Sequence, residues 1–267
     1  MKSKRLIAIL GVLGFLVVLI VMSSTLFTLQ SISVNWLTSK YRLENVDDYQ
    51  IVKDVEKGQS IFLLKKDDIS SKLEKSFPYL RVVSIETKFP NKIVIHTAER
   101  ESLYAIKLSD SEYAVIDEKG KVLTLTDGSI FEGSEADLGT RPILVNFENM
   151  ALDVKDYVEG EDIKNTYIKN LLSDLSLSFR ESRYSPTTCK GVMKSIDIES
   201  EGKKSEVNIQ TRNGMVLKIH EIEEYTTDKL LLGFERYNYY HTQGIVDCTI
   251  EVWYCAETSS IVADVQW

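Results

Sequence analysis

The residues that most often carry out chemistry are few and scattered in this chain of 267 residues. Histidine occurs only at His96, His220 and His241, and none lies in a His-Glu-x-x-His motif or beside a serine or cysteine partner motif. By strand alternation, His96 falls on the polar side of its strand, where a solvated histidine is expected rather than a general base. The histidines therefore predict neither a metal site nor acid–base catalysis.

Carboxylates are abundant, and a pair of them could in principle serve a glycoside hydrolase. The acidic clusters 132–137 and 221–224 are the obvious candidates, but in a chain with 40 Asp and Glu adjacent carboxylates arise by chance. Four glycines match neither the Walker nor the dinucleotide fingerprint: Gly120, Gly128, Gly133 and Gly139. We therefore predict no catalytic residue, no cofactor site and no small-molecule substrate.

The three cysteines, Cys189, Cys248 and Cys255, do not make the disulfide framework of a small secreted domain. Cys248 and Cys255 are seven positions apart, so on one uninterrupted strand they would point to opposite faces and could not form a bridge. Since no Cys-x-x-Cys pair or nearby histidine completes a ligand set, free thiols are expected and a metal is not.

Length, composition and charge limit the class of protein. At roughly 100 to 200 residues per domain, the chain suits a membrane anchor followed by two modest domains. Hydrophobic residues make up 43% and charged residues 27%, which is an ordinary globular mixture. The net charge is −8, and such an acidic surface makes nucleic acid an improbable partner.

An apolar segment near the N-terminus predicts a transmembrane helix over residues 6–28. Leu6 to Phe27 carries no charge, and about 20 such residues span the ~30 Å hydrocarbon layer of a bilayer. Lys2, Lys4 and Arg5 precede it, so the positive-inside rule places residues 1–5 in the cytoplasm and the bulk of the chain outside. A cleaved signal peptide ending near Ser23 and Ser24 is the alternative, but the apolar core is longer than a signal peptide requires.

The next segment, residues 30–100, reads as strand, helix, helix, strand, strand. Residues 32–36 alternate as a strand; Asn45 is placed to cap a short helix, and Asp67 or Asp68 to cap a second helix that ends before Pro78. Alternating strands then flank a Pro90-Asn91 turn. We expect a small α+β domain with two helices on a three-stranded sheet.

Residues 101–267 predict a β-rich domain with two helices. The helices are expected over 163–179 and 227–237, and Asn213-Gly214 is a strong hairpin signal between two apolar strands. Two closing strands follow at 245–252 and 261–267. The last would be an edge strand, whose unpaired N–H and C=O groups a partner segment can complete.

Several short motifs resemble one family when taken in order. They are G-x-S-I-F at 58–62, F-P-Y-L at 77–80, K-F-P-N-K-I-V-I at 88–95 and A-E-R at 98–100. Together with the single anchor they resemble the POTRA domain of the FtsQ/DivIB bacterial cell-division proteins. Further on, Y-A-V-I-D-E-K-G-K-V-L at 113–123 and R-P-I-L at 141–144 resemble the family's second, β-rich domain.

Two features depart from that pattern. Asp247-Cys248-Thr249 stands where the family has an Asp followed shortly by an Arg, and the cluster from Tyr237 to Tyr240 has no counterpart.

The resemblance implies a non-enzymatic, single-pass scaffold at the division septum. Its expected partners are the FtsL- and FtsB/DivIC-like bitopic division proteins and the septal synthase complex, bound through the end of the β domain. Applied here, it predicts partner contacts at Trp253, Tyr254, Ile261, Val262, Ala263, Asp264, Val265 and Trp267.

Two other functions compete with a scaffold. One is a membrane-anchored peptidoglycan hydrolase that uses a carboxylate pair. The other is a single-POTRA secretion or transport component, which should carry several POTRA copies or a series of ~10-residue alternating barrel strands. The sequence contains one POTRA-like segment and no such series.

Overall fold

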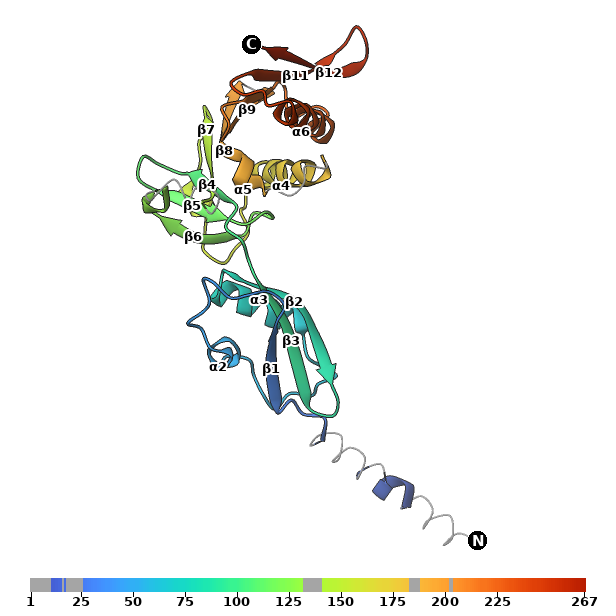
Figure 1. Cartoon of the computed structure of the whole chain (residues 1–267). Coiled ribbons are helices and arrows are strands. Elements are labelled where there is room, and N and C mark those ends of the chain that lie inside the picture. The colour runs from blue at the N-terminus through green and yellow to red at the C-terminus, as the bar shows by residue number, and fades with distance from the viewer. Residues whose placement is uncertain (1–10, 16, 18–25, 132–140, 183–187, 202–203) are drawn as a thin grey trace. The chain divides into compact units, whose positions relative to one another are not determined.

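The computed structural model describes residues 11–15, 17, 26–131, 141–182, 188–201 and 204–267 (Figure 1). The chain divides into two compact units, residues 1–100 and 101–267. The predicted tail, residues 1–5, lies outside the described residues, as does most of the predicted transmembrane segment. Residues 11–15 and 17 are helical and exposed. Over the described ranges, no helix combines the length and apolarity needed to cross a bilayer.

The first unit has a three-stranded sheet in the order β1-β3-β2. Its elements are β1 (Ser31–Trp36), α2 (Asp48–Val52), α3 (Lys66–Ser76), β2 (Leu80–Lys88) and β3 (Lys92–Glu99). Strand β3 is central, parallel to β1 and antiparallel to β2. Apolar residues of the helices and strands share one core that includes Ile51, Leu73, Ile93 and Ile95. The predicted α+β arrangement of two helices and three strands is confirmed.

The helix starts in this unit differ from the sequence prediction. Helix α2 is capped by Asp47 and not by Asn45, because the Asp47 carboxylate accepts from the Tyr49 and Gln50 amides while the Gln50 side chain accepts from the Asp47 amide. Helix α3 begins after Lys65 with no side-chain cap. Its aspartates lie in the first turn, where their charge favours the positive end of the helix dipole.

Replacing Asp47 with alanine is expected to lower the free energy of unfolding of the first unit by about 1 kcal/mol, because two amides of α2 lose their acceptor. Chemical denaturation followed by the fluorescence of Trp36, in a background that carries Trp253→Phe and Trp267→Phe, measures this change. Asp47→Ser, which keeps a capping oxygen, should recover most of the loss. An unchanged unfolding curve for Asp47→Ala would show that the cap contributes nothing.

The second unit is built on a nine-stranded sheet in the order β12-β11-β10-β9-β8-β7-β4-β5-β6. Its strands are β4 (Tyr104–Lys107), β5 (Tyr113–Ile116), β6 (Val122–Thr126), β7 (Ile143–Glu148), β8 (Met193–Glu201), β9 (Lys204–Thr211), β10 (Val216–Ile219), β11 (Thr249–Cys255) and β12 (Ser260–Gln266). Its helices are α4 (Thr166–Glu181), the single turn α5 (Cys189–Val192) and α6 (Thr226–Thr242), with short 3-10 turns at Ser129–Phe131 and Val154–Asp156.

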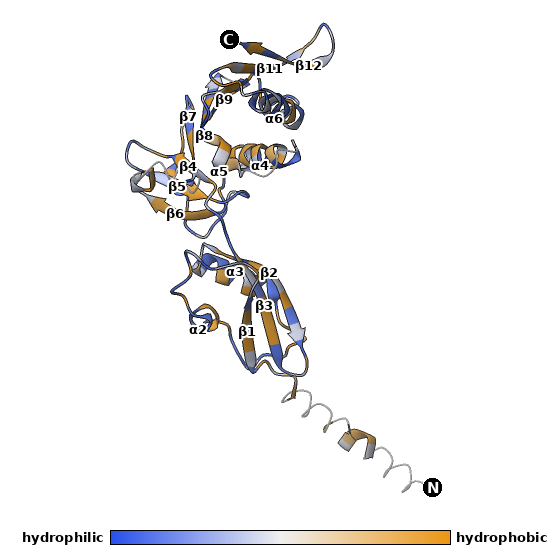
Figure 2. Ribbon diagram, in the orientation of Figure 1, coloured by the Kyte–Doolittle hydropathy of each residue, from blue (hydrophilic) through white to orange (hydrophobic). Residues whose placement is uncertain are grey.

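Helices α4 and α6 lie side by side against the sheet and bury its inner face (Figure 1). Phe179 of α4 and Phe234 of α6 meet edge to face with their ring centroids 5.3 Å apart. Alternate residues of the central strands, such as Val207 and Ile209, are buried beneath them, and Figure 2 shows the apolar residues gathered on the strands. The cover that the helices give the sheet extends to its last strand, because α6 contacts β10, β11 and β12.

Candidate interaction surface

Strand β12 is the last strand of the nine-stranded sheet and pairs with β11 alone. The pairing is antiparallel and regular, from Thr249 opposite Gln266 to Cys255 opposite Ser260. Over residues 204–267, which are described without a gap, no backbone hydrogen bond joins β12 to any other segment. One side of β12 is therefore open.

The backbone direction in β11 follows from its bonds to β10. The Val216 amide donates to the Cys248 carbonyl, and the His220 amide to the Val252 carbonyl, both at 2.9 Å. Because backbone groups alternate along a strand, the even-numbered residues of β11 face β10 and the odd-numbered ones face β12.

This alternation decides which groups of β12 face outward. The odd-numbered residues of β11 lie opposite Val262, Asp264 and Gln266, so those three point their backbone groups inward. The N–H and C=O groups of Ile261, Ala263 and Val265 therefore point to the open side. In agreement with this, the Val265 amide donates to the Asp264 carboxylate at 2.8 Å.

The side chains of β12 divide between two faces. Ile261, Ala263 and Val265 pack against the helix-covered core but stay half-buried, whereas Ile250 and Val252 of β11 are 0% exposed. The half-buried row has core on one side and no further strand on the other. An added strand would cover it, and each buried CH₂ group is worth about 0.8 kcal/mol.

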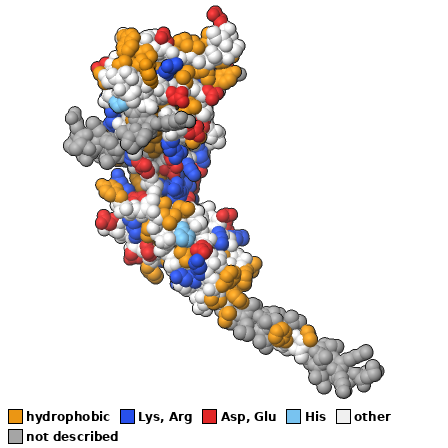
Figure 3. All heavy atoms as spheres, turned by 45° about the vertical axis from the view of Figure 1, so that its right-hand side comes forward, with side chains coloured by type: hydrophobic (Ala, Val, Ile, Leu, Met, Phe, Trp, Pro, Cys, Tyr) orange, Lys and Arg blue, Asp and Glu red, His pale blue; other side chains and the backbone are white. Residues whose placement is uncertain are grey.

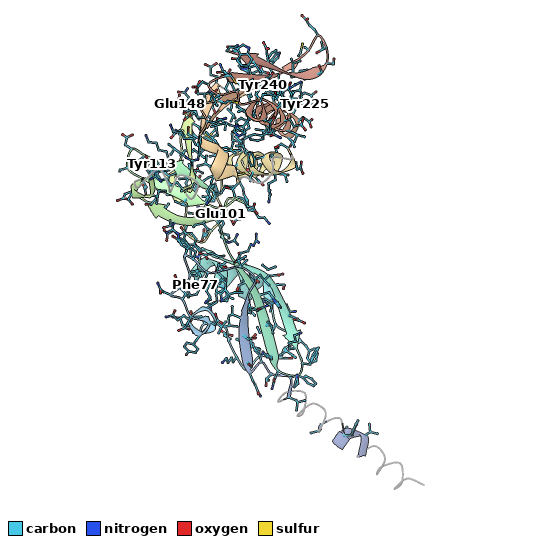
Figure 4. The ribbon with its side chains drawn as sticks, in the orientation of Figure 1. Phe77, Glu101, Tyr113, Glu148, Tyr225 and Tyr240 are labelled. Carbon is cyan, nitrogen blue, oxygen red and sulfur yellow. The ribbon has the colours of Figure 1, made fainter. Side chains whose placement is uncertain are left out.

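Aromatic residues stand at both ends of the open edge (Figure 4). At one end, Tyr225, just before α6, stacks on Tyr254 of β11 with ring centroids 4.8 Å apart. At the other end, Tyr240 of α6 meets Trp267 edge to face at 6.2 Å, and Trp267 is 82% exposed. Trp253 lies opposite Val262 on the other face of the sheet.

The opposite edge of the sheet, β6, is closed by the chain itself. The Val122 amide donates to the Glu161 carbonyl at 2.9 Å, and the Gly160 amide donates to the Val122 carbonyl at 2.8 Å. The Glu159 carboxylate also accepts from the Leu125 amide at 2.8 Å. Strand β12 has no such cover, and its sequence contains neither the lysine nor the proline that often protects an edge.

A cavity of about 400 Å³ lies beside β11, lined by His220, Glu221, Lys229, Glu251, Trp253 and Tyr254. Its polar groups are engaged in structural contacts. Nδ1 of His220 is 2.8 Å from the Glu206 carboxylate, and Nζ of the buried Lys229 donates to the His220 and Glu221 carbonyls at 2.9 and 2.6 Å. Burial lowers the pKa of Lys229.

In the acidic cluster 221–224, Glu221 and Glu223 lack the raised pKa that a general acid needs. A hydrogen bond from Lys204 lowers the pKa of Glu221. Burial acts to raise the pKa of Glu223, but hydrogen bonds from Ser205 and Tyr167 outweigh it, so this pKa is lowered too. The other candidate cluster, 132–137, lies outside the described residues. No group of three or more possible metal ligands occurs in the described ranges.

The cysteines are free thiols, as the sequence predicted. Cys189 and Cys248 are buried, and Cys255 at the end of β11 is half-buried. Burial raises the pKa of Cys189 to about 12, so this thiol stays protonated and unreactive at neutral pH.

Residues 42–100, which include both helices and two strands of the first unit, match the POTRA domain of FtsQ type. The chain is also similar to "Cell division protein DivIB" of Clostridium tetani, at 32% identity over 43% of this chain and 40% of that protein. Residues 42–100 therefore match a POTRA domain of FtsQ type, and the chain is similar to cell-division proteins named DivIB and FtsQ.

Two further cell-division proteins are similar to part of this chain. "Cell division protein FtsQ" of Rickettsia typhi is 37% identical over 29% of each chain. "Cell division protein DivIB" of Lactococcus lactis is 24% identical over 50% of this chain and 32% of the relative. The aligned part thus spans less than half the length of each of these three relatives.

Sequence reasoning missed two aromatic residues beside the candidate surface, Tyr225 and Tyr240. Tyr225 adopts a positive φ of 57° just before α6, which nothing in its local sequence signals. A signal for Tyr240 was available, because the apolar stripe of α6 continues from Phe234 to the buried Tyr237 at helical spacing. Extending the helix by one turn would have placed Tyr240 near the closing strands.

Proposed function

We propose that this protein is a non-enzymatic scaffold of the bacterial divisome, and that it binds a partner strand along the open side of β12. The partners are FtsL- and FtsB/DivIC-like bitopic proteins, which connect it to the septal synthase complex. The observation that carries the proposal is the outward backbone of Ile261, Ala263 and Val265, next to a half-covered apolar row. The division proteins among its relatives support the cellular role.

The proposal includes a membrane anchor at residues 6–28 and an extracytoplasmic location for both units. Its support is the uncharged apolar run and the helical, exposed side chains of Val12, Leu13 and Phe15. Exposed apolar helices are stable in lipid and unfavourable in water. The chain should stay with the membrane after alkaline extraction, and a variant lacking residues 1–25 should be released.

Truncation after Ser260 tests the partner site. We expect the truncated chain to lose the FtsL- and DivIC-like proteins in a pull-down from the same cells, and a fluorescent fusion of the full chain to form a band at mid-cell. If the truncated chain retains both partners, β12 is not the partner-binding strand. The truncated chain must also be shown to be folded, by a circular dichroism melt that matches that of the full chain, because truncation makes β11 the new edge strand.

Salt dependence separates two modes of association. If basic residues of the partner meet the acidic surface of this chain, the association rate should fall several-fold between 50 and roughly 500 mM salt, because exposed charges are screened over ~8 Å or less. Stopped-flow kinetics with the soluble partner segment measures this rate. A rate that does not change with salt would mean that backbone pairing and apolar contact act alone.

Incubation with purified peptidoglycan addresses the competing hydrolase. Under the proposal no soluble fragments are released. Release that disappears in a Glu221→Gln, Glu223→Gln double variant would favour a carboxylate-pair enzyme instead.

A further inference from the structure

Three phenylalanine rings from separate segments meet at one end of the first unit, and with the neighbouring Leu63 they form what we call the aromatic tip. The ring of Phe62 lies 5.2 Å from that of Phe27 and 5.6 Å from that of Phe89, and Phe27 and Phe89 are 6.4 Å apart. Phe62 is 62% exposed, Phe89 is 65% exposed and Leu63 is 78% exposed. Large apolar side chains that gather on a surface in this way mark a contact site.

The backbone holds the aromatic tip together and ties it to the chain that enters the unit. The Ile61 amide donates to the Phe27 carbonyl at 2.9 Å, and Thr28 pairs with Ser60 in an isolated β-bridge. The Gln30 amide donates to the Asn91 carbonyl at 2.9 Å, which joins the entering chain to the β2–β3 turn. The rings are thus presented by three connected backbone segments and not by a free loop.

The aromatic tip continues directly into the apolar N-terminal run. Phe27 belongs to both, and Leu26 beside it is exposed. Figure 3 shows apolar side chains gathered at the end of the first unit that adjoins the N-terminal segment. A bilayer that receives residues 6–28 would lie against this end. The lipid interface can therefore cover the apolar patch without any additional partner.

Four lysines lie close in the sequence to the residues of the aromatic tip. Lys88 and Lys92 flank the turn that carries Phe89, and Lys65 and Lys66 follow Leu63 by two and three residues. Lys88 is paired with Glu86 at 2.5 Å and Lys65 with Asp68 at 3.9 Å, whereas Lys66 and Lys92 make no ion pair within the described part of the chain. Lysines at the rim of an apolar patch reach lipid phosphates with their ammonium groups while their stems cover apolar surface.

We propose that the aromatic tip inserts into the boundary between headgroups and acyl chains of the membrane and so fixes the orientation of the POTRA domain relative to the bilayer. The inference rests on the membrane anchor that we proposed above and goes beyond it. An anchor alone would keep the domain near the bilayer without fixing which of its faces contacts lipid. A second, aromatic contact at the surface fixes which end of the domain faces lipid.

Depth-dependent quenching in proteoliposomes tests this contact. The full chain, with its three cysteines replaced by alanine, receives one environment-sensitive NBD label, at Leu63→Cys beside the rings or at Tyr41→Cys as a matched control. Tyr41 is 81% exposed, and its backbone contacts Glu99 at the far end of β3 from Lys92, roughly 23 Å away along the strand. The vesicles are mixed phosphatidylcholine and phosphatidylglycerol, with and without brominated acyl chains.

We expect the label at residue 63 to shift to the blue and to be quenched by brominated lipid, and the label at residue 41 to behave as in water. Adding Phe62→Ser and Phe89→Ser should abolish quenching at residue 63 while the protein still floats with the vesicles. Equal responses at 63 and 41 in floating protein, or quenching that survives the double substitution, would overturn the inference and leave the anchor standing. A chain that does not float would overturn the anchor and this inference with it.

Discussion

Replacing Ala263 with proline is expected to weaken partner binding at least tenfold, a loss of about 1.4 kcal/mol or more. The Ala263 amide points to the open side of β12, so proline removes a donor that a partner strand would use and places its ring in the path of that strand. The bonds between β12 and β11 use the neighbouring residues and should be unaffected. Calorimetric titration with the extracytoplasmic segment of the FtsL- or DivIC-like partner measures the loss.

Two substitutions control for local disruption. Asp264→Asn changes the outer face of β12 and leaves the outward backbone donors in place, so it should bind within about threefold of the wild type. Val262→Pro removes an amide that faces β11 and should instead destabilise the closing hairpin. If Ala263→Pro binds as tightly as Asp264→Asn while retaining its fold, the partner does not pair with the backbone of β12.

Removing the ring of Phe234 should lower the free energy of unfolding of the second unit by about 3 to 5 kcal/mol. This side chain is buried at the contact between α4 and α6, where it meets Phe179 edge to face. Alanine would leave a cavity that the facing helices can fill only partly. Partner binding should weaken as well, because α6 supports the half-buried row of β12.

Trp36→Phe is a useful background for this measurement, since the remaining tryptophans, Trp253 and Trp267, then report the second unit alone. Denaturation in detergent followed by their fluorescence gives the unfolding midpoint. Leu232→Ala, a half-buried position on the same helix, is the matched control and should lose no more than about 2 kcal/mol. Equal losses for the two variants would show that the ring contact between the helices carries little stability.

Local patterns predicted the secondary structure well where a single turn or stripe determines it. Asn213-Gly214 turns the chain between β9 and β10, and Gly214 has the positive φ of 93° that favours glycine. The start of α2 was placed two residues early, because Asn45 and Asp47 can both cap and only the reciprocal bond with Gln50 decides between them. Strand β11 starts at Thr249 and not near Ile245, since Gly244 and Asp247 both take positive φ and form a turn.

Local sequence patterns did not predict which strands pair when they are distant in the sequence. The sequence does not reveal that β10 and β11 run parallel, yet this pairing sets the backbone direction in β11 and hence which groups of β12 face outward. The stack of Tyr225 on Tyr254 likewise joins residues 29 positions apart through the fold. The partner role of the eight predicted residues stays a prediction.

Hydrogen–deuterium exchange of individual amides in the full chain, with and without the partner's extracytoplasmic segment, tests the central claim most directly. Strand addition predicts that the outward amides of Ile261, Ala263 and Val265 become strongly protected in the complex. In the unbound protein the amides of Ile261 and Ala263 should exchange freely, and that of Val265, which donates to the exposed Asp264 carboxylate, should exchange somewhat more slowly. The amides of Val262 and Asp264, already bonded to β11, should change little. If the partner binds and the three outward amides keep their free exchange rates, backbone pairing along β12 is contradicted.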